Sequence, residues 1–134
     1  MKVLVDTSVW LPALRKKPIS TDLGVDALFK LITTGQSVYI LGLIMYEVVC
    51  GFRTPKERKE LEQMLSAFPI IEISKEDYLY AVDVNGACRM KGITTSTVDS
   101  IIAAAAIRYD CHLLTTDKDF ERIAKITPLQ LLKY

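Results

Sequence analysis

Few cysteines and a single histidine are present, which argues against two common kinds of small domain. The 134 residues include only Cys50, Cys88, Cys111 and His112 as thiol or imidazole groups. An odd number of widely spaced cysteines, with no Cys-x-x-Cys pair, argues against a disulfide framework and against a structural zinc site. We therefore expect reduced cysteines that fill core space, in a cytoplasmic protein.

Long hydrophobic runs and an excess of one charge are also lacking. The longest apolar run, residues 38–46, ends at Glu47 and is far shorter than the roughly 20 residues of a membrane helix. The apolar start at 3–5 is too short for the apolar region of a signal peptide. Lys and Arg number 17 against 16 Asp and Glu, so only local basic patches could attract a nucleic acid.

What is present is a balanced globular composition arranged as alternating strands and helices. Half of the residues are hydrophobic and a quarter are charged, which suits a single domain over 1–134. Capping residues such as Thr54 and Ser74 and stop signals such as Gly51 mark the helix ends. Strands are expected at 2–6, 38–41, 69–73 and 111–115, with a fifth if 128–133 pairs, and helices at 7–15, 22–33, 43–50, 54–68, 74–91, 97–109 and 117–125.

This alternation predicts a three-layer α/β/α sandwich with a central, mainly parallel sheet of four to five strands. Ligands of such sheets bind outside the carboxyl ends of the strands, close to the point where the strand order reverses. Asp6 ends the first strand and Asp117 follows the fourth. Glu47 and Asp99 lie on helices among apolar neighbours, so we expect Glu47 to point into a cleft or the core. Because burying a lone carboxylate is costly, a divalent cation would be one way to keep it ionised.

Each of these acids also has a purely structural interpretation. Asp6 could hold a turn with the residues that follow it, and Asp99 or Asp117 could cap a helix. Glu47 could pair with a buried arginine. The structural interpretations fit the set of four less well, because two acids fall at strand ends and two on otherwise apolar segments.

Four segments resemble, in order, the motifs of the PIN-domain family. They are Val-Asp-Thr-Ser-Val-Trp at 5–10, Glu47 with Gly51, Thr-Val-Asp-Ser-Ile-Ile-Ala-Ala-Ala at 97–105, and Leu-Leu-Thr-Thr-Asp-Lys-Asp-Phe at 113–120. The chain is most similar to the VapC-type toxins of toxin–antitoxin pairs. The resemblance implies a Mg²⁺- or Mn²⁺-dependent endoribonuclease that cleaves single-stranded or looped RNA. It also implies a homodimer and a cognate antitoxin protein as partner.

The resemblance further implies roles for particular residues. The catalytic and metal-binding acids would be Asp6, Glu47, Asp99 and Asp117. Outer-shell residues would be Thr7, Thr116 and Asp119, for which turn chemistry, or a capping box begun by Thr116, is the structural alternative.

Contacts to RNA need cationic side chains, and the candidates follow two predicted elements. Arg15, Lys16 and Lys17 come shortly after the first predicted strand, and Arg53 lies just beyond the helix of Glu47. For any single one of these residues, a solvated surface or a helix-end charge is the commoner explanation. Trp10 could stack on a base, although core packing is commoner for an aromatic residue at this helical spacing.

Two other classes of function were weighed against the ribonuclease. A receiver-type phosphoacceptor domain requires an acidic pair at the end of the first strand, whereas Asp6 is followed by Thr7 and Ser8. A haloacid-dehalogenase phosphatase requires a second aspartate at position 8. A catalytically inactive protein-binding module on the same fold would not need all four acids.

Overall fold

The computed structural model describes residues 1–15 and 22–134. The predicted RNA contacts Lys16 and Lys17 lie outside the described residues. Among the described helices, none is both long enough and apolar enough to cross a membrane.

A sheet of four parallel strands forms the centre of the molecule. The strands are β1 (Lys2–Val5), β2 (Ser37–Leu41), β3 (Ile70–Ile71) and β4 (His112–Leu114), in the order β3-β2-β1-β4. In register, Val3 of β1 lies opposite Val38 on one side and His112 on the other. The strands read as short apolar runs because helices cover both faces of the sheet.

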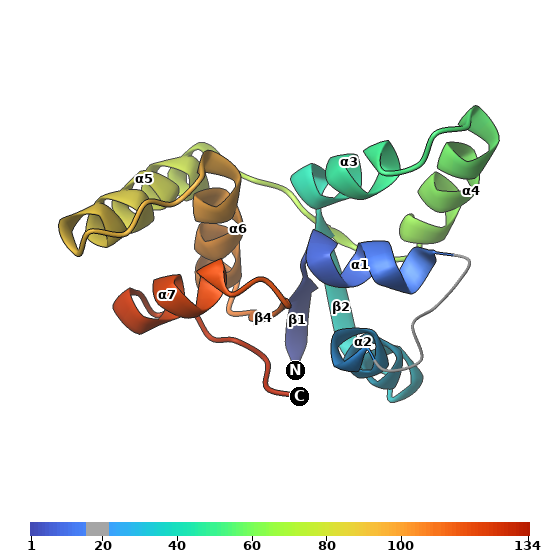
Figure 1. Ribbon diagram of the computed structural model, residues 1–134, viewed down its shortest axis with the longest axis horizontal. Helices are drawn as coiled ribbons and strands as arrows, with labels where there is room; N and C mark the ends of the chain where they lie inside the picture. The colour runs from blue at the N-terminus through green and yellow to red at the C-terminus, as the bar shows by residue number, and fades with distance from the viewer. Residues whose placement is uncertain (16–21) are drawn as a thin grey trace.

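Within residues 1–15 and 22–134, seven helices form the two outer layers (Figure 1). On one side lie α1 (Thr7–Leu14), α2 (Leu23–Thr33), α3 (Gly42–Cys50) and α4 (Pro55–Leu65), and on the other lie α5 (Lys75–Met90), α6 (Thr97–Arg108) and α7 (Asp119–Ile126). The chain moves outward from β1 to β3 and then returns through α5 and α6 to β4, on the opposite side of β1. The strand order therefore reverses between β1 and β4, which predicts a ligand site at their carboxyl ends.

The predicted helix starts agree with the observed caps. The Thr54 hydroxyl accepts a hydrogen bond from the backbone N–H of Glu57, with Pro55 in the first turn of α4. Ser74 and Asp77 form a complete capping box at the start of α5. On α6, the four alanines at 103–106 are fully buried, and this helix contacts both α5 and β4. These short side chains allow α6 to lie close to the sheet.

Several expectations about individual segments were wrong. Residues 128–133 form no strand: Leu131 makes only one isolated parallel bridge with Leu113. The third strand is limited to two residues. Cys50 is exposed, because it lies at the end of α3, whereas Cys88 and Cys111 are buried as expected.

Trp10 belongs to the core. It is 2% exposed, its indole N–H donates to the Val5 carbonyl over 3.1 Å, and its ring lies edge-on to Phe68 at 5.1 Å between centroids. Stacking of Trp10 on an RNA base is therefore not compatible with this fold, and the core-packing interpretation holds.

Candidate metal centre

Asp6 is held in a fixed orientation at the end of β1. Its side chain is buried, and Oδ2 accepts hydrogen bonds from the Ser8 hydroxyl at 2.8 Å and the Thr115 hydroxyl at 2.9 Å. The backbone N–H of Ser8 donates to the same oxygen over 3.4 Å, which caps α1. Within the described residues no hydrogen bond reaches Oδ1, so this oxygen is free to bind a ligand.

Ser8 and Thr115 also join the ends of β1 and β4. The backbone N–H of Asp117 donates a hydrogen bond to the Thr115 hydroxyl over 3.0 Å. The backbone N–H of Thr116 donates to the Ser8 hydroxyl, also over 3.0 Å. The two hydroxyls are 3.2 Å apart. The turn that carries Asp117 is thus fastened to the turn that carries Asp6. The sequence indicated Ser8 only as a turn partner of Asp6, which the hydrogen bonds from its N–H and hydroxyl bear out. It did not indicate Thr115, although the position of Thr115 directly after a buried strand could have suggested an inward side chain.

Three further carboxylates converge beside this junction. Each of Asp99, Asp117 and Asp119 offers an oxygen, and these oxygens lie within 4.8 Å of one another. Asp99 is half-buried in the first turn of α6, and Asp117 follows β4. The backbone N–H of Asp119 donates to Asp117 Oδ1 over 2.9 Å, which orients that carboxylate.

None of these three aspartates is the N-cap of its helix, although Asp117 Oδ1 accepts the Asp119 N–H and Asp99 is hydrogen-bonded to Ser96. The cap of α6 is Ser96, whose hydroxyl accepts the N–H of Asp99 at 3.0 Å, so Asp99 is not itself the cap. Helix α7 begins after Lys118 and has no side-chain cap, so the capping box proposed for Thr116 and Asp119 does not form. Asp99 and Asp117 are therefore not helix caps, and Asp119 is not part of a capping box. The Asp117 side chain accepts the N–H of Asp119 in the turn before α7.

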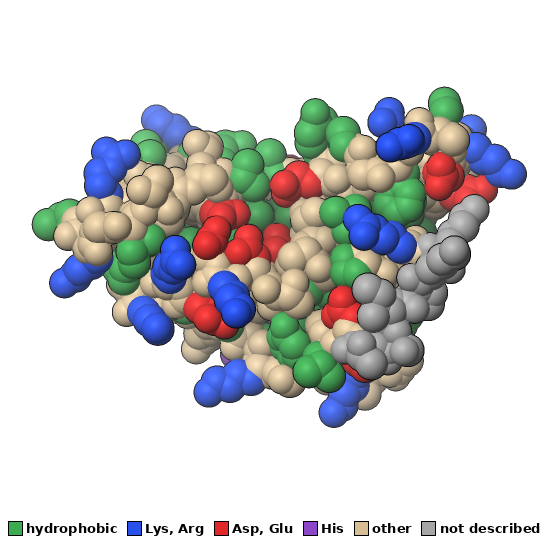
Figure 2. Space-filling view, viewed as in Figure 1, with side chains coloured by type: hydrophobic (Ala, Val, Ile, Leu, Met, Phe, Trp, Pro, Cys, Tyr) green, Lys and Arg blue, Asp and Glu red, His purple; other side chains and the backbone are tan. Residues whose placement is uncertain are grey.

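The cluster is strongly negative (Figure 2). Burial, together with the negative charges of Asp117, Asp6 and Asp119, raises the pKa of Asp99 to about 6, and a hydrogen bond with Ser96 partly opposes the shift. Figure 2 shows acidic side chains near the centre of one face, between the α6–α7 side and the α1–α3 side, with most Lys and Arg side chains farther out. Among the described residues, the one ion pair in the cluster joins exposed Asp119 and Arg122 at 3.9 Å.

Glu47 differs from the expectation that it points into a cleft or the core. Its side chain is exposed, and like Asp6 it lies outside the group of three acids whose oxygens converge. Ile44 and Val48 form the buried face of α3, and Glu47, three residues after Ile44, lies at the edge of that face, where its side chain reaches solvent. The Thr7 hydroxyl donates to Glu47 Oε1 over 3.1 Å, which connects Glu47 to the residue next to Asp6.

The remaining predicted residues lie outside the cluster. The Thr116 side chain is exposed, and its methyl group faces Gly24, where an added Cβ would lie only 2.8 Å away. Arg15 and Arg53 are exposed. Their exposure is compatible with contacts to RNA and equally with a solvated surface.

The donor set of the cluster is typical of hard cations. Only carboxylate oxygens converge, which are ligands that Mg²⁺ and Mn²⁺ prefer, whereas no thiol or imidazole of the described residues joins the group. A cation would relieve the repulsion that raises the pKa of Asp99. The residues present therefore fit a divalent metal.

A parallel α/β fold with converging carboxylates at its switch point is thus established, and comparison with known proteins places it in a family. The PIN domain family model matches residues 3–126, and the chain belongs to the PIN-domain family. The sequence is similar to ribonuclease VapC1 of Rickettsia felis, at 32% identity over 92% of this chain and 91% of that protein. It is also similar to ribonuclease VapC11 of Mycobacterium tuberculosis, at 28% identity over 98% of each chain.

Solved structures share the fold. VapBC2 from Rickettsia felis, bound to a DNA fragment from its promoter, has a TM-score of 0.79 at 20% identity, covering 100% of this chain and 99% of that one. DNA-bound VapBC from Salmonella typhimurium has a TM-score of 0.78 at 18% identity, covering 98% and 97%. The predicted three-layer PIN-like fold is confirmed.

Proposed function

We propose that this protein is a metal-dependent endoribonuclease, the toxin of a VapC-type toxin–antitoxin pair. The observation that carries the proposal is the convergence of Asp99, Asp117 and Asp119 beside Asp6 at the switch point. The names of the curated relatives support a ribonuclease. The substrate would be single-stranded or looped RNA.

Asp6, Asp99 and Asp117 would hold the cation, Mg²⁺ or Mn²⁺, and Asp119 would join them directly because its oxygen lies within the same group. A bound divalent cation would lower the pKa of a water molecule and stabilise charge on the phosphodiester. Ser8 and Thr115 would position Asp6 by fixing Oδ2, leaving Oδ1 for the metal. Glu47 would act from outside, through the hydrogen bond from Thr7.

The partners follow from the similarity to VapC ribonucleases. We propose that a cognate antitoxin protein binds this chain, that two copies form a homodimer, and that the protein acts in the cytoplasm. Sedimentation of the partner-free protein at micromolar concentration tests the dimer, since a strictly monomeric species would contradict it.

The decisive test of the proposed function is RNA cleavage by the purified, partner-free chain. A mixed pool of single-stranded RNA is incubated with manganese, magnesium or EDTA, using the unaltered protein, Asp6→Asn and Asp99→Asn. We expect cleavage only with a metal and a loss of at least about a hundredfold in each variant, because losing a ligand costs more than losing an outer-shell partner. Asp83→Asn, an exposed aspartate on α5, is the matched control and should cleave normally.

Other outcomes would favour other functions. Absence of both cleavage and manganese binding by calorimetry would favour the catalytically inactive binding module. Acid-labile labelling of Asp6 by a small phosphodonor would favour the receiver-type phosphoacceptor. Manganese binding without cleavage would mean that the RNA substrate is narrower than the pool.

A further inference from the structure

The segment 129–134 runs alongside β4 and ends next to the acidic cluster. The N–H of Leu113 donates to the Gln130 carbonyl, and the N–H of Leu132 donates to the Leu113 carbonyl, each over 2.9 Å. The Tyr134 hydroxyl donates to the Thr115 carbonyl at 3.3 Å. Tyr134 is therefore fixed to the residue whose own hydroxyl holds Asp6 and Asp117 in place.

A cavity of about 560 Å³ lies between this segment and the turn after β4. Asp117, a member of the acidic cluster, lines it directly. Leu131, Leu132 and Tyr134 provide apolar and aromatic surface. The volume lies within the roughly 300–1,000 Å³ of small-molecule sites. A ligand in this cavity would thus lie beside any phosphodiester held at the cluster.

The charges around the cavity indicate which part of a nucleotide it would bind. Lys118 and Lys133 line it, but so do Asp117 and Glu121, so the two positive charges are balanced by two negative ones. A neutral base is therefore favoured inside, against the half-exposed ring of Tyr134. The two exposed lysines can reach phosphates at its rim.

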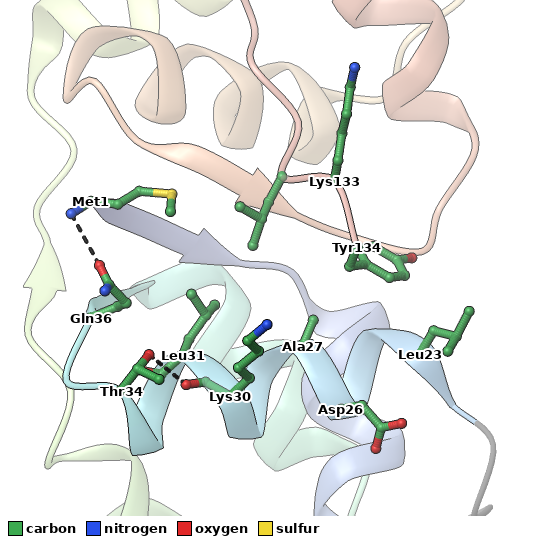
Figure 3. Close-up of a pocket in the computed structure, with 11 residues that line it drawn as sticks. Met1, Leu23, Asp26, Ala27, Lys30, Leu31, Thr34, Gln36, Lys133 and Tyr134 are labelled. Carbon is green, nitrogen blue, oxygen red and sulfur yellow. Dashed lines mark hydrogen bonds between the residues drawn. The ribbon is translucent and has the colours of Figure 1, made fainter.

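A second cavity, of about 580 Å³, lies on the other side of the same segment (Figure 3). Its walls come from α2, Met1 and residues 132–134, and Lys30 and Leu23 point along it. None of the converging acids lines this cavity. Because it has no acid of the cluster in its wall, it serves as the comparison for the first cavity.

We propose that the cavity beside Asp117 binds one nucleotide of single-stranded RNA, adjacent to the phosphodiester that is cleaved. The base stacks on Tyr134, and Lys118 and Lys133 contact the flanking phosphates. Aromatic stacking accepts every base because each has a π-face, so this site contributes affinity more than sequence preference. The inference rests on the proposed ribonuclease function.

The test is equilibrium binding of a short, fluorescent, mixed-sequence single-stranded RNA, measured by anisotropy in EDTA at several salt concentrations. All variants carry Asp99→Asn, so that no cleavage interferes. Tyr134→Leu keeps apolar volume but removes the ring and should weaken binding about tenfold. Tyr134→Phe keeps the ring, loses the hydrogen bond to Thr115, and should bind like the parent. Tyr78→Leu, at a half-exposed tyrosine on α5, is the matched control.

The same assay tests the two cavity lysines through the salt dependence of RNA binding. Lys118→Ala and Lys133→Ala should each reduce the slope of log affinity against log salt by about 0.7, the value for one phosphate contact on a single strand. Lys30→Ala, at the second cavity, should leave the slope unchanged.

The inference is overturned if the parent shows no binding, if Tyr134→Leu binds as tightly as the parent, or if Tyr134→Phe is weakened as much as Tyr134→Leu. Failure of the proposed function is seen separately, as absence of metal-dependent cleavage by the unaltered protein.

Discussion

Two aspartates at the starts of neighbouring helices meet opposite surroundings. Asp77, in the first turn of α5, is 2% exposed and accepts hydrogen bonds from the Ser74 N–H at 2.8 Å, Arg108 Nε at 2.6 Å and the Tyr109 hydroxyl at 3.2 Å. Asp99, in the first turn of α6, faces other carboxylates instead. Both belong to helices that pack against each other.

Their ionisation reflects this difference. Burial acts to raise the pKa of Asp77, but the hydrogen bonds from Ser74, Arg108 and Tyr109 outweigh it and hold the pKa below its usual value. Burial also raises the pKa of Asp99, and there the nearby acids add to the shift, which brings it to about 6. Asp77, which stabilises the fold, is surrounded by hydrogen-bond donors. The acids around Asp99 have too little positive charge nearby, and a bound cation would provide it.

The largest expected difference between the two aspartates is in how much each contributes to stabilisation of the protein by a bound metal. Manganese at a hundred times its dissociation constant should raise the free energy of unfolding by about 2.7 kcal/mol, because it binds only the folded cluster. Thermal unfolding with and without manganese measures this. Asp99→Asn should lose most of the increase, whereas Asp77→Asn should keep it. An equal increase in both variants would place the cation elsewhere.

The contribution of Asp77 to the stability of the fold can be tested directly. Asp77→Asn should lower the free energy of unfolding by about 2 kcal/mol, since it leaves Arg108 without its anion. The loss should be smaller than for a fully buried pair because Arg108 is 39% exposed. Denaturant titration near neutral pH measures the effect, with Asp83→Asn as the surface control. Unchanged stability would mean that the pair contributes nothing net.

The hydroxyls around Asp6 should have an intermediate effect. Thr115→Val keeps the shape of the side chain but removes its donor to Asp6 Oδ2 and the acceptor for Asp117 N–H. Manganese affinity measured by calorimetry should fall about tenfold, equivalent to about 1.4 kcal/mol. Thr33→Val, on the exposed surface of α2, is the matched control. An unaltered affinity would reduce Thr115 to a purely structural role.

The smallest effect should be a dependence of metal-free stability on pH. Asp99 binds its proton more tightly when folded, at a pKa of about 6 against an ordinary value of 3.8. Stability should therefore fall as pH rises between these values. In EDTA near neutral pH, Asp99→Asn should melt about 2 °C above the unaltered protein. This advantage should vanish at a pH of about 4, and a constant difference would contradict the charge-based explanation.

Much of the fold could be predicted because it depends on local physics. Helix caps such as Ser74 and Thr54 act over three or four residues, and alternating strands and helices favour a parallel sheet. Residues 128–133 were harder, because an apolar segment of that length pairs as a strand only if an edge is available in register. Here the pairing is limited to one isolated bridge between Leu131 and Leu113, with hydrogen bonds from Leu113 to Gln130 and from Leu132 to Leu113.

The sequence by itself determined which acids stand at the ends of strands and the starts of helices, and hence that Asp6, Asp99 and Asp117 were candidates. Only the tertiary structure decided that Asp119 joins Asp99 and Asp117, that Glu47 lies on the surface, and that Ser8 and Thr115 fasten β1 to β4. The reason is that strand order and the rotation of each helix about its axis depend on packing between distant segments. One residue's rotation, about 100° on a helix, is enough to move a carboxylate from a shared site to solvent.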